Sequence, residues 1–111
     1  MSSHRDLIAW QIAQETATAI HKYADNSWKP SRAAALDQLR RASLSVVLNL
    51  VEGHACGRGP RCRFHLRIAH GSAAEVVAIL EFLEGLGDPV TELKAPSRRL
   101  AAITYGLWKK S

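Results

Sequence analysis

Apolar residues recur at helical spacing along four segments of the chain, and residues that favour turns separate these segments. The separators are Trp28-Lys29-Pro30, then Gly57, Gly59 and Pro60, and finally Gly87-Asp88-Pro89. The pattern therefore predicts helices at about residues 4–25, 31–53, 60–86 and 89–109. Helices with such short connections are typical of an all-α, up-down-up-down four-helix bundle. A length of 111 residues suffices for one core, so residues 1–111 are expected to form a single domain.

Particular residues mark the expected ends of these helices. Ser3 and Asp6 have the spacing of an N-terminal capping box, and Ser31 is the expected N-cap of the second helix. Pro89 is expected at the first position of the fourth helix. Pro96 interrupts the apolar pattern there, so that helix either kinks at Pro96 or begins its regular part at this residue.

The predicted first and fourth helices each carry one apolar stripe. In the first helix the stripe consists of Leu7, Trp10, Ala13, Ala17, Ile20 and Ala24. In the fourth helix it consists of Val90, Leu93, Leu100, Ile103 and Leu107. Both stripes are expected to face the core of the bundle.

The predicted second and third helices are apolar on two sides, which a lone four-helix monomer does not require. On the second helix, one seam comprises Leu36, Leu39, Ser43, Val46 and Leu50, and a second strip comprises Leu44, Val47, Leu48 and Val51. On the third helix, one seam comprises Leu66, Ala69, Ala73, Val76, Leu80 and Leu83, and another comprises Phe64, Ile68, Gly71, Ile79, Phe82 and Leu86. The second strips favour homo-oligomerisation, although wide burial within one chain would also account for them.

Charge is distributed unevenly along the chain, whose formal net charge is +5. Residues 1–35 carry +1, residues 36–70 carry +4, residues 71–93 carry −5 and residues 94–111 carry +5. Two interpretations remain open. Oppositely charged neighbouring helices pair with each other, or a basic surface binds nucleic acid while acidic residues are kept elsewhere.

The arginines around the second connection carry the one functional signal in the sequence. The candidate nucleic-acid-binding residues are Arg58, Arg61, Arg63 and Arg67 at this end of the helical hairpin, with Arg40 and Arg41 further along the second helix. The guanidinium group suits phosphate because its planar fork donates two hydrogen bonds at once. No aromatic residue interleaves with these arginines, so we expect salt-dependent contacts with an RNA or DNA backbone rather than base reading.

Cysteines, histidines and carboxylates near this connection give no clear chemical motif. Cys56 and Cys62 are five residues apart, and His54 and His65 flank them irregularly, so two ordinary cytosolic thiols are favoured over a metal site. The spacing of Cys62 and His65 would suit a nucleophile and its base, but nothing supplies an orienting third group.

Glu52, Arg67 and Glu75 could be mistaken for acid–base catalysts. We expect them instead to form a structural network between the second and third helices, together with Asn49. The sequence therefore predicts neither an enzyme nor a cofactor. The N-terminus lacks the apolar core of a signal peptide, and the longest apolar run is too short for a bilayer, which favours a cytoplasmic protein.

Several motifs occur in the order and spacing of one known family. They are Gln38-Leu39-Arg40-Arg41-Ala42 with Ser45, Asn49 and Glu52-Gly53; residues 64–72 with Glu75; residues 7–13; and Leu86-Gly87. In these motifs nearly the whole chain resembles the bacterial four-helix-bundle proteins encoded within intervening sequences of 23S ribosomal RNA genes. The accessory variability determinant of diversity-generating retroelements is related to this family. Val47 stands where the family commonly has proline, and His21 where tyrosine is usual.

The resemblance implies an up-down bundle that assembles into a ring, most commonly a pentamer. For the retroelement branch it also implies RNA binding and a reverse-transcriptase partner, whereas this chain resembles the ribosomal branch more closely. We therefore predict a non-enzymatic homo-oligomer that binds nucleic acid, RNA in particular, as an accessory protein. The alternative is a protein-interaction or assembly scaffold without nucleic-acid binding.

Overall fold

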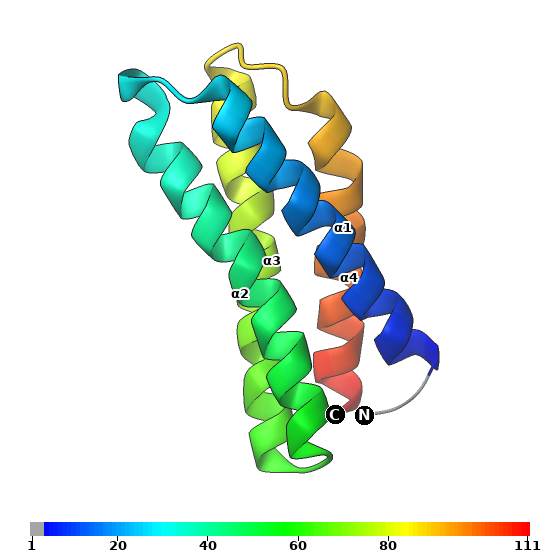
Figure 1. The fold of residues 1–111 in the computed structure, drawn as a ribbon. Helices are drawn as coiled ribbons and strands as arrows, with labels where there is room; N and C mark the ends of the chain where they lie inside the picture. Colours follow the sequence, from blue (N-terminus) through cyan, green and yellow to red (C-terminus); the bar gives the residue numbers. More distant parts are fainter. Residues whose placement is uncertain (1–3) are drawn as a thin grey trace.

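Four helices make up the computed structural model of the chain, which describes residues 4–111 and the side chains from Asp6 onward (Figure 1). The helices are α1 (His4–Ser27), α2 (Ala33–Cys56), α3 (Pro60–Gly85) and α4 (Thr91–Lys110), and a short 3-10 turn, η1 (Pro30–Arg32), precedes α2. Consecutive helices run antiparallel and pack side by side, and α4 also packs against α1. The predicted all-α four-helix bundle is therefore confirmed. No helix in the described part is long and apolar enough to cross a membrane.

Two of the predicted helix starts are wrong by two residues. Ser31 lies within η1 rather than at the N-cap of α2, because the Arg32 amide donates to the Lys29 carbonyl and tightens this segment into a 3-10 turn. Pro89 precedes α4, which begins at Thr91. Pro96 lies inside α4, so the regular part of this helix begins before Pro96 and not at it.

α2 continues three residues beyond its predicted end at Gly53. Gly53 is buried in the helix, where its backbone lies against Leu66 and His65 of α3. Gly57 follows the last helical residue with φ 76°, a conformation that favours glycine, and it ends α2. At the other end of the chain, Ser3 of the predicted capping box lies outside the described residues.

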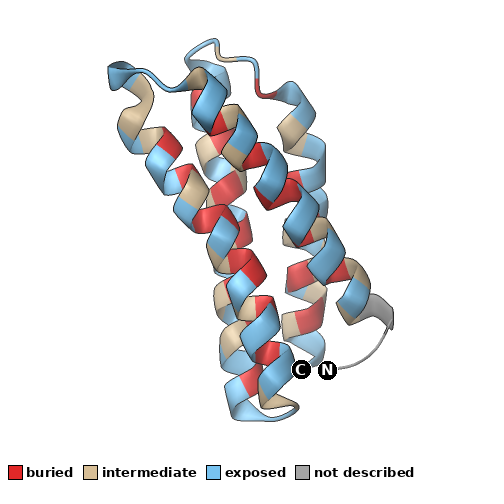
Figure 2. Ribbon diagram, viewed as in Figure 1, coloured by how far each residue is buried: buried red, intermediate tan, exposed pale blue. Residues whose placement is uncertain are grey.

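The core confirms the first seam of α2 and the first seam of α3. All their members are buried, and Figure 2 shows buried residues along the inward side of each helix. The second strips remain largely at the surface. Their exposed members are Leu44, Leu48 and Val51 on α2, and Phe64, Gly71, Phe82 and Leu86 on α3. Val47 is the one buried member of the second strips, so one chain does not cover this apolar surface.

The predicted stripe of α1 is wrong at its N-terminal end. Leu7 and Trp10 are 53% and 37% exposed, whereas Ala9 and Thr16 are buried together with the alanines further along. Ala9 lies four residues before Ala13, and Trp10 lies three residues before it. Either residue therefore continues the helical spacing of the stripe. The small side chain occupies the inward position, because it lets α1 approach its neighbours closely.

α4 buries two hydroxyl groups as well as the predicted Leu100 and Leu107. The Ser97 hydroxyl donates to the Leu93 carbonyl at 2.7 Å, and the Thr104 hydroxyl donates to the Leu100 carbonyl at 2.8 Å. These bonds within the helix satisfy the hydroxyl donors inside the apolar core.

Candidate nucleic-acid interface

The turn between α2 and α3 gathers arginines at one end of the bundle. Gly57 and Gly59 have φ values of 76° and 101°, and Pro60 starts α3. Arg58 lies in this turn and Arg61 in the first turn of α3, and both are exposed. The N-terminus of α3 adds the positive end of its helix dipole. Backbone and side chains therefore both favour a negatively charged partner here.

The C-terminus of the chain lies at the same end (Figure 1). Arg63 donates from Nε and Nη2 to the Ser111 carbonyl at 3.2 and 2.7 Å, which fixes the end of α4 beside α3. This contact places Lys109 and Lys110 near the arginine turn. We call this surface the basic end; it comprises Arg58, Arg61, Arg63, Arg67, Lys109 and Lys110.

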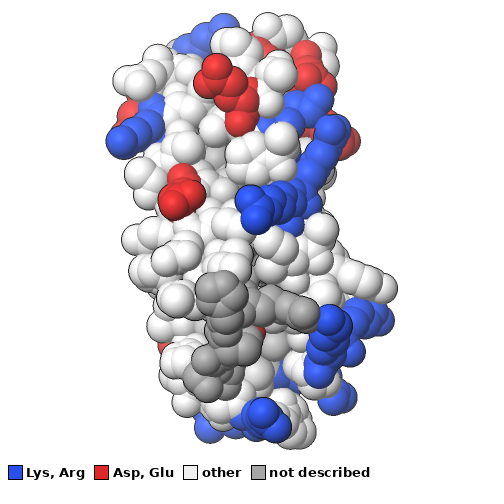
Figure 3. Space-filling view, turned by 90° about the vertical axis from the view of Figure 1, so that its right-hand side faces the viewer, with Lys and Arg blue, Asp and Glu red and all other residues white. Residues whose placement is uncertain are grey.

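The two lysines were not among the predicted residues, because more than forty residues separate them from the turn. The concentration of charge in residues 94–111 was the signal that could have identified them. Figure 3 shows the side of the molecule formed by α1 and α4. Acidic side chains there gather toward the opposite end, and basic ones predominate at the basic end.

Arg40 and Arg41 do not join the basic end. They lie about 25 Å along α2 from the turn, as the helical rise requires. Arg40 pairs with Asp25 at 2.5 Å and with Asp37 at 3.3 Å, so its charge is already balanced. Arg41 is exposed at the same level of the helix.

The acidic half of the molecule is paired with basic residues of neighbouring segments. Glu84 accepts from Lys94 at 2.6 Å, Glu81 from Arg98 at 3.5 Å, and Asp88 pairs with Arg32. By contrast, Arg58, Arg61 and Arg67 pair with none of the carboxylates in the described part of the chain. Ion pairing therefore accounts for three of the five carboxylates in residues 71–93, whereas Arg58, Arg61 and Arg67 at the basic end have no ion-pair partner among the described residues.

Polar residues link α2 and α3 along the middle of the hairpin. His65 Nδ1 and Asn49 Oδ1 are 3.0 Å apart, and Asn49 also donates to the Ser45 carbonyl. The hydroxyls of Ser45 and Ser72 lie 2.8 Å apart. The prediction that Asn49 joins an interhelical network is thus confirmed, with His65 as its partner.

The other predicted members of this network behave differently. Glu75 accepts from Gln38 of α2 at 2.6 Å rather than from Arg67. Arg67 and Glu52 are exposed and take part in none of these hydrogen bonds. Arg67 is therefore free to add its charge to the basic end.

An aromatic cluster borders the basic end at Lys109. Lys109 Nζ lies 4.4 Å from the ring centroid of Trp108 and 5.6 Å from that of Tyr105. His70 stacks on Trp108, with ring centroids 5.9 Å apart and planes inclined by 22°. His70 comes from α3 and the rings of Tyr105 and Trp108 come from α4, so only the folded chain brings this cluster together. The His70 ring and Lys109 Nζ already contact the ring of Trp108, whereas the side chain of Tyr105 is 48% exposed to solvent.

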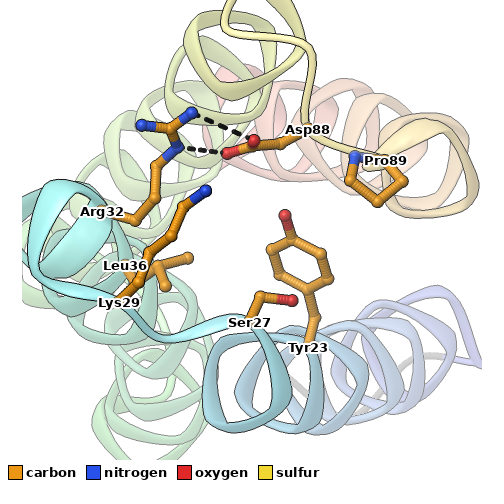
Figure 4. Close-up of a pocket in the computed structure, with 7 residues that line it drawn as sticks. All are labelled: Tyr23, Ser27, Lys29, Arg32, Leu36, Asp88 and Pro89. Carbon is orange, nitrogen blue, oxygen red and sulfur yellow. Dashed lines mark hydrogen bonds and ion pairs between the residues drawn. The ribbon is translucent and has the colours of Figure 1, made fainter.

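A pocket of about 220 Å³ lies at the opposite end of the bundle (Figure 4). It is lined by Tyr23, Ser27, Lys29, Arg32, Leu36, Asp88 and Pro89. Its volume is below the roughly 300–1,000 Å³ typical of small-molecule sites. Arg32 holds Asp88 through two hydrogen bonds of 2.5 and 3.2 Å, and this contact lowers the pKa of the Asp88 carboxyl. Burial raises the pKa of Tyr23. The ion pair joins the start of α2 to the connection between α3 and α4, which gives this pocket a structural role.

Comparison with known proteins identifies a family. The model of the family described as 23S rRNA-intervening sequence protein matches residues 5–92, which span α1, α2, α3 and the start of α4. No curated protein and no solved structure matched the chain.

Proposed function

Because the chain belongs to the 23S rRNA-intervening sequence protein family, we propose that it is a non-enzymatic, homo-oligomeric protein that binds RNA through its basic end. The observation that carries this proposal is the segregation of charge. Acidic residues pair at one end of the bundle, while Arg58, Arg61 and Arg67 lie exposed at the other without a carboxylate partner among the described residues. A patch of this kind attracts phosphate groups.

Binding of this type is expected to follow the shape and charge of the nucleic-acid backbone. Arg58 lies in the turn and Arg61 lies at the start of α3. Backbone N–H groups at the start of a helix can also donate to phosphate oxygens. Affinity is therefore expected to depend strongly on salt and weakly on sequence.

The exposed apolar strips support assembly into a closed ring. Leu44, Leu48 and Val51 on α2 are each about half exposed, and so are the aromatic rings of Phe64 and Phe82 on α3. The strips belong to different helices, so a strip of one subunit can pack against the other strip of the next. Such head-to-tail contacts close into rings, and we propose five subunits. Each ring would repeat the basic end around its axis and multiply its charge.

RNA binding is tested by titrating labelled single-stranded RNA and duplex DNA with purified protein, following fluorescence anisotropy over a salt series. The informative variant is Arg58→Gln with Arg61→Gln. Its matched control is Arg40→Gln with Arg98→Gln, which removes the same charge from arginines that are already ion-paired. Loss of two phosphate contacts should reduce the salt slope for RNA by about 1.4, since each contact contributes about 0.7.

The control variant should bind like the wild type. Equal weakening of both variants would show that net charge alone attracts RNA, and would refute the basic end as the binding surface. No binding by the wild type even at low salt would favour a second function, an assembly scaffold whose partner is a protein. The exposed strips on α2 and α3 are the observation that favours this alternative.

A further inference from the structure

Three potential metal ligands meet where α2 ends beside α3. Glu52 and Cys56 are four residues apart on α2 and therefore lie on the same face, one turn apart. His65 of α3 lies across the hairpin from them. One ligand atom from each of the three residues lies within 4.8 Å of the others. We propose that Glu52, Cys56 and His65 form a binding site for a zinc ion.

The orientation of His65 is the second observation that points to a metal. Its Nδ1 lies 3.0 Å from the side-chain oxygen of Asn49, which accepts a hydrogen bond from the Nδ1–H group and leaves Nε2 as the nitrogen with a free lone pair. Asn49 is held in turn by the Ser45 carbonyl at 2.9 Å. Histidines that bind metals are characteristically fixed in this way, by a hydrogen bond from the other ring nitrogen.

The donor set selects the metal. A thiolate, an imidazole nitrogen and a carboxylate oxygen together suit Zn²⁺, whereas Mg²⁺ and Ca²⁺ require oxygen ligands throughout. Tetrahedral zinc bonds of about 2.0–2.3 Å place neighbouring ligand atoms about 3.5 Å apart. Glu52 is exposed and can rotate to close the remaining gap, while Cys56 and His65 are half-buried. The fourth position remains for water.

Charge and protons balance in the binding step. The neutral thiol of Cys56 loses its proton to solvent as its sulfur bonds to the metal. The thiolate and the Glu52 carboxylate then bring two negative charges to the doubly positive ion. The bound site is neutral, so the nearby arginine turn does not oppose it.

The sequence pattern placed Cys62, His54 and His65 near Cys56, but it did not associate Glu52 with them. Cys62 is only 5% exposed and packs in the apolar core, and His54 is exposed and outside the cluster. The ligands instead combine a pair at helical spacing with one residue from the neighbouring helix. A search for short cysteine spacings does not detect such an arrangement.

The test uses the full chain without an affinity tag, stripped with a chelator and then titrated with Zn²⁺ or Co²⁺ alone. Competition with a chromophoric chelator gives the Zn²⁺ affinity and stoichiometry, and the Co²⁺ spectrum reports thiolate ligation and tetrahedral geometry. The informative variants are Cys56→Ala and His65→Gln. The matched controls are Cys62→Ala and His54→Gln, and circular dichroism verifies that all four variants are folded.

We expect one Zn²⁺ per chain, and a thiolate-to-cobalt absorption band that disappears in Cys56→Ala. Cys56→Ala and His65→Gln should weaken Zn²⁺ binding at least tenfold, while both controls retain it. If Cys56→Ala binds Zn²⁺ like the wild type, or if Cys62→Ala weakens binding equally, the site is wrongly assigned. If the wild type binds no Zn²⁺, there is no site. These readouts do not involve RNA and are independent of the proposed function.

Discussion

Replacement of Leu48 by glutamate is expected to dissociate the proposed oligomer while leaving the fold of each subunit intact. Leu48 lies on the outer strip of α2 and is 52% exposed, so its substitution creates no cavity in the core. Burying a whole leucine side chain contributes about 1.5–3 kcal/mol, so the exposed half represents about 1 kcal/mol at a subunit contact. Burying an unpaired carboxylate there costs several kcal/mol more. A total of about 4 kcal/mol per contact weakens association roughly a thousandfold.

Sedimentation velocity and light scattering over a range of protein concentrations measure this effect directly. The wild type should have the mass of a pentamer and Leu48→Glu that of a monomer, with equal helix content by circular dichroism. Ala19→Glu is the matched control, because it places the same charge on an exposed position of α1. Wild-type mass in Leu48→Glu would refute the assignment of this strip to the interface. A wild type that is monomeric at every concentration would refute the oligomer itself.

Three further predictions concern stability, measured by chemical denaturation at one protein concentration. Leu80→Ala should lower the free energy of unfolding by about 2–5 kcal/mol, since Leu80 is fully buried; a loss below about 1 kcal/mol would contradict its assignment to the core. Gly53→Ala should raise the free energy of unfolding by about 0.5–1 kcal/mol, because alanine is favoured over glycine inside a helix and the new Cβ lies 3.4 Å from Leu66, an ordinary contact. A lower denaturation midpoint than that of the wild type would show that the new Cβ clashes with Leu66. The lowered pKa of Asp88 means that its ion pair stabilises the fold above the ordinary carboxyl pKa of 3.8, and that this contribution is lost as pH falls through the lower pKa of the folded state. The deficit of Asp88→Asn relative to wild type should therefore shrink in acid, and a constant deficit would exclude this linkage.

The sequence predicted the buried seams of α2 and α3 because one apolar period runs through each helix, from Leu36 to Leu50 and from Leu66 to Leu83. It did not predict which face of α1 is buried, because Ala9 and Trp10 fit the helical period equally well. Hydrophobicity alone favours tryptophan at the inward position, but close packing of helices requires the alanine. Local patterns identify a helix more readily than they identify the face it buries.

The candidate site could be predicted only in part for a related reason. Arg58 and Arg61 are neighbours in sequence and remain neighbours in space, so a charge pattern detects them. Lys109 joins them only because the bundle returns α4 to the same end. Arg40 has the right chemistry, but its pairing with Asp25 becomes visible only when α1 packs against α2.

The alanines that line the inner face of α1 also have a kinetic consequence. Ala9, Ala13 and Ala17 bury little apolar area each, so this part of α1 exposes little apolar surface when it separates from the bundle. The α2–α3 hairpin closes across a turn of residues 57–59, which costs little chain entropy. We expect this hairpin to form early, α1 to dock last, and α1 to be the first helix released by thermal fluctuation in the folded protein. Amide hydrogen exchange should therefore be fastest in α1, and equal protection of all four helices would contradict this order.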